Sequence, residues 1–261
     1  MEKKKKRLII LSIIAGALIF IMLLSSAIFQ IKSVSIEYQT TLTMLTKEDL
    51  NSMVSKANLP IGKSIFFTSL DEHILTMEKD NPYAKINGIE RKFPNSLVVL
   101  VSERVPVVRV KNGSGYYVLD NELKVLNIAS TDSEYNSKTA ESDLPELVLT
   151  GAYALDLSGV QKGSFVNNET IKPYVEAIYR GAVTPSKENK DVAVSILSTI
   201  ETITISYSTE LQKVVFDLTY TGESITSKII GDNNLVDNLY KVLGVVEDSL
   251  STGKNYSYVN C

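Results

Sequence analysis

The chain has 261 residues, of which 44% are hydrophobic and 22% are charged, and its formal net charge at pH 7 is -3. These values are ordinary for a globular protein, so they exclude a wholly disordered chain and a strongly basic nucleic-acid binder. A single Cys and a single His exclude an internal disulfide, a thiolate metal cluster and a His-rich metal site.

The N-terminus departs from this composition, because basic residues at positions 3–7 run directly into an apolar segment without charge at 8–29. As a helix this segment spans about 33 Å, roughly the thickness of one bilayer core. We therefore expect a basic cytoplasmic tail at 1–7, a transmembrane helix at 8–29 and an exported C-terminal part, following the positive-inside rule. A cleaved signal peptide stays open as the alternative, since small residues at 25–27 suit a signal peptidase.

The residues after the apolar segment predict a small unit of strands and helices. A run rich in β-branched residues predicts a first strand at 31–38. Two helices follow, at 47–57 and before Asn81-Pro82, where proline ends the second one. A hydroxyl residue stands just before each helix, and an acidic residue follows it three positions later, inside the first turn. This pattern predicts two capping boxes, Thr46 with Asp49 and Ser69 with Glu72.

Two further strands complete this unit, at 83–92 and 96–104. The second strand is nearly continuous in β-branched and apolar residues, which predicts a central strand covered by helix on one face. Asn87-Gly88 interrupts the alternation of the first strand and predicts a bulge. The order β-α-α-β-β therefore predicts a three-stranded sheet with both helices on one face, ending at Pro106.

Beyond Pro106 the pattern predicts mostly strands. A hairpin is expected around Asp120-Asn121-Glu122, between strands at 116–119 and 123–126. The polar stretch 129–143 predicts a long surface loop. The remaining expected elements are a helix at 169–181 that Pro173 forces to start late or to kink, strands at 192–197, 200–207, 213–219 and 224–230, a helix at 234–249, and a last short strand at 255–259.

Several motifs are typical of enzymes, but none has the context that the chemistry needs. Gly62-Lys63-Ser64 matches the end of a P-loop, yet Ala57 stands where the first Gly belongs. Ser251-Thr252-Gly253-Lys254 matches the S-x-x-K of penicillin-recognising enzymes, whose further elements have no room downstream. His73 has no second His and no Ser-His-Asp order around it. We expect no catalytic residue, no cofactor, no metal and no small-molecule substrate.

A linear order of small features is more informative than any one motif. After the apolar segment come Gly62-Lys63-Ser64-Ile65-Phe66 and Asn81-Pro82-Tyr83-Ala84. The pattern then continues with Arg-x-x-Pro-x-x-Leu at Arg91, Pro94 and Leu97, Glu-Arg-x-Pro-Val at Glu103, Arg104 and Pro106, Tyr117-Val118-Leu119-Asp120, and Leu144-Pro145-Glu146-Leu147. This order resembles the bacterial division family FtsQ/DivIB, over about residues 1–151 well and over the rest in outline. The chain departs from the family at Asn121, where Gly is usual, and in the less regular stretch 152–190.

The resemblance implies an α+β protein with a POTRA-type domain at 30–105 and a mostly antiparallel β domain with a late helix at 106–261. It implies a scaffold rather than an enzyme, located in the cell membrane at the division septum and bound to FtsL-like and DivIC/FtsB-like partners, with no nucleic acid. By this analogy partner contact is expected on the last strands, whose edges offer unpaired backbone groups, and on the final helix. The candidate partner residues are Asn255, Tyr256, Ser257, Tyr258 and Val259. An exported cell-wall enzyme with an unrecognised site and a POTRA-type transport or chaperone component stay open as alternatives.

Overall fold

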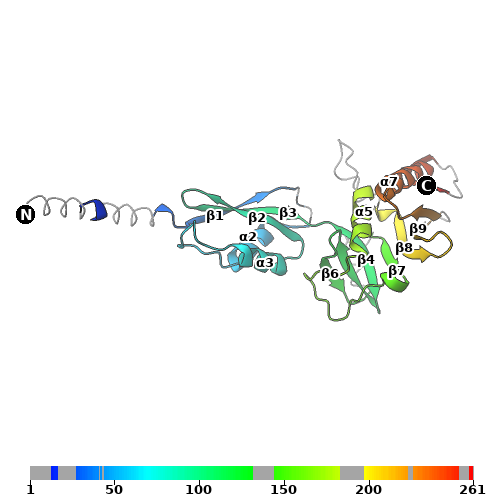
Figure 1. The fold of residues 1–261 in the computed structure, drawn as a ribbon, viewed down its shortest axis with the longest axis horizontal. Helices are drawn as coiled ribbons and strands as arrows, with labels where there is room; N and C mark the ends of the chain where they lie inside the picture. The colour runs from blue at the N-terminus through cyan, green and yellow to red at the C-terminus, as the bar shows by residue number, and fades with distance from the viewer. Residues whose placement is uncertain are drawn as a thin grey trace, which may run out of the picture. The chain divides into compact units, whose positions relative to one another are not determined.

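The computed structural model describes residues 13–16, 28–40, 42, 44–131, 144–182, 197–222, 226–252 and 259–260. The chain divides into two compact units, Met1–Glu103 and Arg104–Cys261, and each is described by itself (Figure 1). The expected transmembrane segment lies mostly outside the described residues, although residues 13–16 and Ile28 are helical. In the described part of the chain, no helix combines the length and the apolar character needed to cross a membrane.

The first unit is a three-stranded sheet with two helices on one face (Figure 1). Its elements in chain order are β1 (Ser33–Tyr38), α2 (Lys47–Lys56), α3 (Asp71–Asp80), β2 (Ala84–Lys92) and β3 (Ser96–Glu103). The strand order is β1-β3-β2, so β3 is central as expected; it pairs with β1 in parallel and with β2 antiparallel. Buried Val99 and Val101 of β3 share a core with Met53 of α2 and Met77 of α3.

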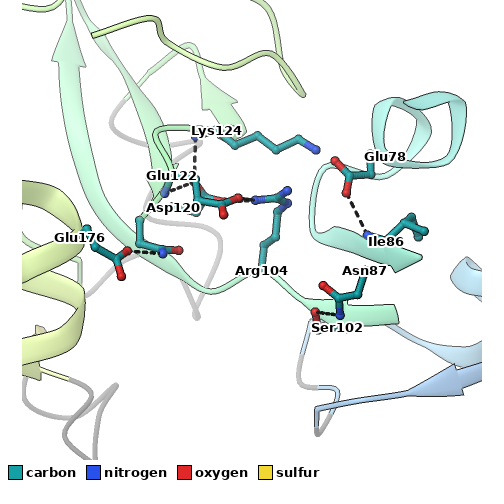
Figure 2. Close-up of polar contacts among 10 residues, drawn as sticks. Glu78, Ile86, Asn87, Ser102, Arg104, Asp120, Glu122, Lys124 and Glu176 are labelled. Atoms are coloured by element: carbon teal, nitrogen blue, oxygen red, sulfur yellow. Dashed lines mark hydrogen bonds and ion pairs between the residues drawn. The ribbon is translucent and has the colours of Figure 1, made fainter. Parts of the chain in front are cut away.

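The expected bulge lies in β2, where the register shifts between Ile86 and Gly88. The bulge is supported by polar side chains from both sides (Figure 2). The Glu78 carboxylate of α3 accepts the N–H of Ile86 at 2.9 Å, and the Asn87 amide donates to the Ser102 hydroxyl at 2.7 Å. The extra residue therefore bends the strand without leaving these polar groups unsatisfied.

The two helices begin differently. At α2 the Thr46 hydroxyl accepts the N–H of Asp49 at 3.1 Å and the Asp49 carboxylate accepts the N–H of Thr46 at 3.0 Å, which completes the predicted capping box. The box predicted at Ser69 and Glu72 is wrong, because Leu70 is the N-cap of α3 and no side chain caps that helix. Leu70 is instead buried in a small core with Ile31, Ile65 and Leu97. Tertiary burial of a leucine, rather than a local hydroxyl, thus determines where α3 begins.

In its described residues, the second unit is one large sheet with two α-helices. Its elements are β4 (Pro106–Asn112), β5 (Gly115–Asp120), β6 (Val125–Ala129), β7 (Glu146–Leu149), the 3-10 turn η1 (Gly151–Tyr153), α5 (Lys172–Ala182), β8 (Ile200–Ser208), β9 (Lys213–Tyr220), β10 (Thr226–Ile230), α7 (Leu235–Thr252) and β11 (Val259–Asn260). Among the described residues the strand order is β11-β10-β9-β8-β7-β4-β5-β6.

Fewer strand pairs of this sheet are antiparallel than the sequence predicted. Four neighbouring pairs of described strands are antiparallel, whereas β10 with β11, β4 with β7 and β7 with β8 are parallel. Parallel neighbours need a long crossover, and α5 lies in the connection between β7 and β8. The short strand β7 and the neighbouring β4 fill the middle of the sheet, yet neither was predicted as a strand.

Other differences from the expected elements are local. Pro173 is the second residue of α5, so the helix starts late and its proline occupies the first turn, where the missing N–H breaks no helical bond. The strand predicted at 192–197 lies outside the described residues except for Leu197, which is in a helical turn. The predicted loop at 129–143 is outside them from 132 onward. Helices α5 and α7 meet at Gly181, where a Cβ would come within 2.8 Å of the Leu239 Cβ.

Candidate partner-binding site

The last strand is an edge of the large sheet. β11 pairs in parallel with β10, and the register places Val259 opposite Ser227 and Asn260 opposite Lys228. Val259 is the one candidate residue that the structure describes; Asn255, Tyr256, Ser257 and Tyr258 lie outside the described residues. A strand at an edge presents its outer backbone N–H and C=O groups to a second chain.

A buried hydrogen bond holds the neighbouring strands of this edge together. The Tyr220 hydroxyl at the end of β9 donates to the Ser227 Oγ of β10 at 2.9 Å, and both residues are buried. Burial raises the pKa of the Tyr220 phenol, and the hydrogen bond with Ser227 opposes the rise only in part. The phenol therefore stays protonated over the ordinary pH range and keeps donating. Beneath the strand, Ile229 shares the main core with Leu239 and Val242 of α7.

The Glu-Arg-x-Pro-Val motif spans the boundary between the two units, and Glu103 belongs to the first. Its carboxylate accepts the N–H of Leu45 at 2.7 Å and also that of Met44, while its own N–H donates to the Thr40 hydroxyl at 2.9 Å. Glu103 therefore holds the segment between β1 and α2 against the end of β3.

Arg104 begins the second unit and is held by two carboxylates (Figure 2). Its Nη1 lies 2.7 Å from Asp120 Oδ2 and 2.6 Å from Glu122 Oε2, and the exposed fractions of the three side chains are 4%, 1% and 32%. Asp120 also accepts the backbone N–H groups of Glu122 at 2.9 Å and Lys124 at 2.8 Å. The cluster therefore ties the start of the second unit to the hairpin between β5 and β6.

The electrostatics of this cluster are those of a structural ion pair. Burial raises the pKa of the Asp120 carboxyl above its ordinary value of 3.8, and the charge of Arg104 is the largest influence that lowers it again. The Arg104 guanidinium and the Lys124 ammonium both lie over the Phe165 ring, at 5.5 and 5.2 Å from its centroid. This aromatic contact partly replaces the water that burial of the two cations removes.

The other family-motif residues are also structural in their contacts. Arg91 donates from Nη2 to the carbonyl of Thr68 at 2.6 Å, which joins the end of β2 to the loop before α3. Pro94 follows a cis peptide bond in that turn, and Leu97 is fully buried behind it. Pro106 opens β4 and is buried. Thus the motif residues build the two units rather than a common surface.

Sequence reasoning missed two features. One is the hydrogen bond between Tyr220 and Ser227, for which the chain offers no local signal. The other is a group of exposed aromatic side chains around Phe66 and Phe67, whose adjacency in a predicted loop was a usable signal. In the part of the chain that the structure describes, no group of three or more His, Cys, Asp or Glu residues is arranged to hold a metal ion.

The fold is thus that of a two-unit α+β protein whose candidate site is a sheet edge. The chain is 28% identical over 108 residues to the cell division protein DivIB of Clostridium acetobutylicum, a match that covers 41% of each chain. It is 27% identical over 92 residues to DivIB of Clostridium tetani, covering 35% of this chain and 34% of that one. No family model matches the chain.

These two matches support an FtsQ/DivIB-family protein and confirm the family that the order of motifs predicted. The matched part spans less than half the length of both curated relatives.

Proposed function

We propose that the chain is a non-catalytic scaffold of the bacterial division septum, anchored in the cytoplasmic membrane by residues 8–29. In this proposal residues 30–105 form a POTRA-type domain and residues 106–261 form a β domain outside the membrane. The β domain lends its C-terminal sheet edge to division proteins of the FtsL and DivIC/FtsB types. The similarity to two cell division proteins named DivIB supports the cellular process.

The observation that carries the partner site is the place of β11 at one end of the described strand order. In the described part of the chain, Val259 and Asn260 pair with Ser227 and Lys228 of β10. A partner strand satisfies backbone groups here when it extends the sheet outside β11. This mode depends on main-chain hydrogen bonds more than on any one side chain.

The anchor is supported by the sequence of the N-terminus, where the basic residues at 3–7 precede the uncharged apolar segment. Protease added to intact spheroplasts should digest the C-terminal domain and spare the basic tail. A domain that stays fully protected contradicts the topology, and a shortened soluble product favours the signal-peptide alternative.

The partner site is tested by capture of purified FtsL-like and DivIC/FtsB-like proteins on the full chain in detergent. Tyr256→Pro and Tyr258→Pro each remove one backbone donor from the strand that the sequence predicts at 255–259 and should weaken capture strongly. Tyr256→Ala and Tyr258→Ala are the matched controls, because they keep the backbone N–H and should weaken capture less.

Amide hydrogen exchange of β8 and β9 separates loss of the edge from loss of the fold. These strands should exchange at the wild-type rate in the proline variants, since a terminal strand contributes few core contacts. Capture at wild-type strength by the proline variants, or loss of capture only together with faster exchange in β8 and β9, contradicts the edge-pairing proposal.

A further inference from the structure

One end of the first unit carries an exposed aromatic patch, defined here as Ile61, Phe66, Phe67 and Phe93 together with the half-buried Phe29. Phe67 is the most exposed of these side chains, at 91%, and Ile61, Phe66 and Phe93 are each exposed by about half. The Phe66 and Phe93 rings stack with centroids 5.1 Å apart, and Phe29 lies 5.0 Å from Phe66. Water-exposed rings that contact one another form a surface patch, which is the usual mark of a binding surface.

Three chain segments are joined by backbone hydrogen bonds to build this end. The N–H of Ile65 donates to the carbonyl of Phe29 at 2.8 Å, within a bridge between Gln30 and Ser64. The N–H of Lys32 donates to the carbonyl of Asn95 at 2.8 Å, which brings in the β2–β3 turn. The patch therefore rests on a fixed backbone frame, above a buried core.

The three segments that build the patch are basic, while Glu72 lines the neighbouring hollow and Glu37 pairs with Lys92 at 3.6 Å. Segments 28–32, 61–68 and 91–95 contain no Asp or Glu, and they carry four exposed basic residues: Lys32, Lys63, Arg91 and Lys92. Lys63 lines the same hollow as Ile61 and Phe67. Aromatic and aliphatic side chains with a basic surround are the composition of protein surfaces that lie at the headgroup level of a membrane.

The position of the patch in the chain points to the same occupant. Phe29 is the last residue of the apolar segment 8–29, so the patch begins where that segment ends. We propose that this patch docks on the outer-leaflet interface of the membrane in which the chain is anchored, with the aromatic rings at the headgroup boundary and the lysines beside anionic lipid phosphates. This inference rests on the proposed membrane anchor.

Docking of this kind restrains the first unit. A domain joined to a membrane segment only by its chain can adopt many orientations relative to the bilayer. A domain that also docks through a surface patch keeps the same side toward the bilayer. The patch thereby sets the direction in which the chain leaves the membrane.

The test uses the absence of Trp from the chain. Phe67→Trp places one fluorophore in the patch, and Tyr38→Trp places one at the other end of β1, about 17 Å along the strand from Ser33. The full chain carrying either substitution is reconstituted in nanodiscs of phosphatidylcholine and phosphatidylglycerol, with and without brominated acyl chains. We expect emission from position 67 to shift to shorter wavelength and to be quenched by bromine, and emission from position 38 to do neither.

Two added substitutions test whether the rings and the lysines of the patch hold it on the membrane. Adding Phe66→Ser and Lys63→Glu to Phe67→Trp should reduce the quenching, and phosphatidylcholine alone should give less quenching than the mixture. Amide hydrogen exchange of β2 and β3 at the parental rate would show that the first unit remains folded.

The outcomes separate the docking from the anchor. If the chain is held in the discs but position 67 is as unquenched as position 38, the docking proposal is overturned and the anchor stands. If position 67 shifts without bromine quenching, and only with two chains per disc, a second copy covers the patch and docking on lipid is overturned. If the chain does not remain in discs at all, both proposals fail.

Discussion

The substitution Arg104→Met tests whether the buried ion cluster holds the second unit together. The change keeps most of the side-chain length and removes the cation that faces Asp120 at 2.7 Å and Glu122 at 2.6 Å. Asp120 is then a buried carboxylate with two backbone donors and without that cation. The charge of Glu122 is destabilised less by the loss of Arg104, because about a third of its side chain is already exposed to solvent.

Removing one partner of a buried ion pair costs about 3–5 kcal/mol, since it leaves an uncompensated charge in a medium of low polarity. Every 1.4 kcal/mol is about a tenfold change in an equilibrium constant, so protection of the second unit should fall by about a hundredfold or more. Lys228→Met is the matched control, because Lys228 and Asp217 form a pair at 3.5 Å that is exposed on both sides. It should cost less than about 1 kcal/mol.

The cost of Arg104→Met should also depend on pH. Burial already raises the pKa of Asp120 in the folded protein, and loss of Arg104 removes the largest influence that lowers it, so that pKa rises further in the variant. Between the ordinary value of 3.8 and the raised pKa, the folded variant binds more protons than the unfolded chain, and its stability therefore falls as pH rises. The difference from wild type should be largest near neutral pH and shrink as the medium becomes acidic.

The assay is amide hydrogen exchange, followed by mass spectrometry, on peptides from β4, β5 and β6 of the full chain in detergent. These peptides report opening of the second unit alone, whatever the stability of the first. A loss of less than about 1 kcal/mol at neutral pH, or a loss that stays constant from neutral to acidic pH, would refute the role assigned to the cluster.

Three further predictions concern the cores and a cap. Val99→Asp places a charge at a fully buried position of the central strand and should lower the free energy of unfolding of the first unit by more than about 3 kcal/mol, measured by exchange in β2 and β3; wild-type exchange there would mean that this core is misplaced. Thr46→Ala should lower the stability of α2 by about 1 kcal/mol, measured by amide hydrogen exchange of that helix. Hydrogen bonds from Thr46 lower the pKa of Asp49, so the wild-type cap is fully present above pH 3.8 and is lost as pH falls through the lower folded pKa; a cap unaffected by acid contradicts this. Tyr220→Phe leaves the buried Ser227 hydroxyl without its phenol partner and should cost about 1–3 kcal/mol, read from exchange in β9 and β10; no change would show that the bond is dispensable.

Features that depend on near neighbours in the chain were predictable from the sequence. The capping box at Thr46 and Asp49 joins residues three positions apart, and the bulge at Asn87-Gly88 breaks a short alternation. The central place of β3 followed from its nearly continuous apolar run, because such a run suits a strand flanked on both sides. The family was also predictable, since its motifs occur in a fixed linear order.

Features that join distant residues were decided only by the tertiary structure. The box expected at Ser69 did not form, because burial of Leu70 beside Ile31 and Ile65 outweighs a local hydroxyl hydrogen bond. Val259 pairs with Ser227 of β10, which lies more than thirty residues earlier in the chain.

The ion cluster and the aromatic patch show the same limit. Arg104 meets Asp120 because the β4–β5 hairpin returns the chain, and Phe29 meets Phe66 because backbone pairing joins their segments. The sequence shows Arg104 only as a charged residue within a motif, and it shows Phe29 and Phe66 only as aromatic residues in separate segments. Hydrophobicity and hydrogen-bonding patterns determine which elements form, whereas the pairing of elements far apart in the chain determines which side chains share a buried site or a surface.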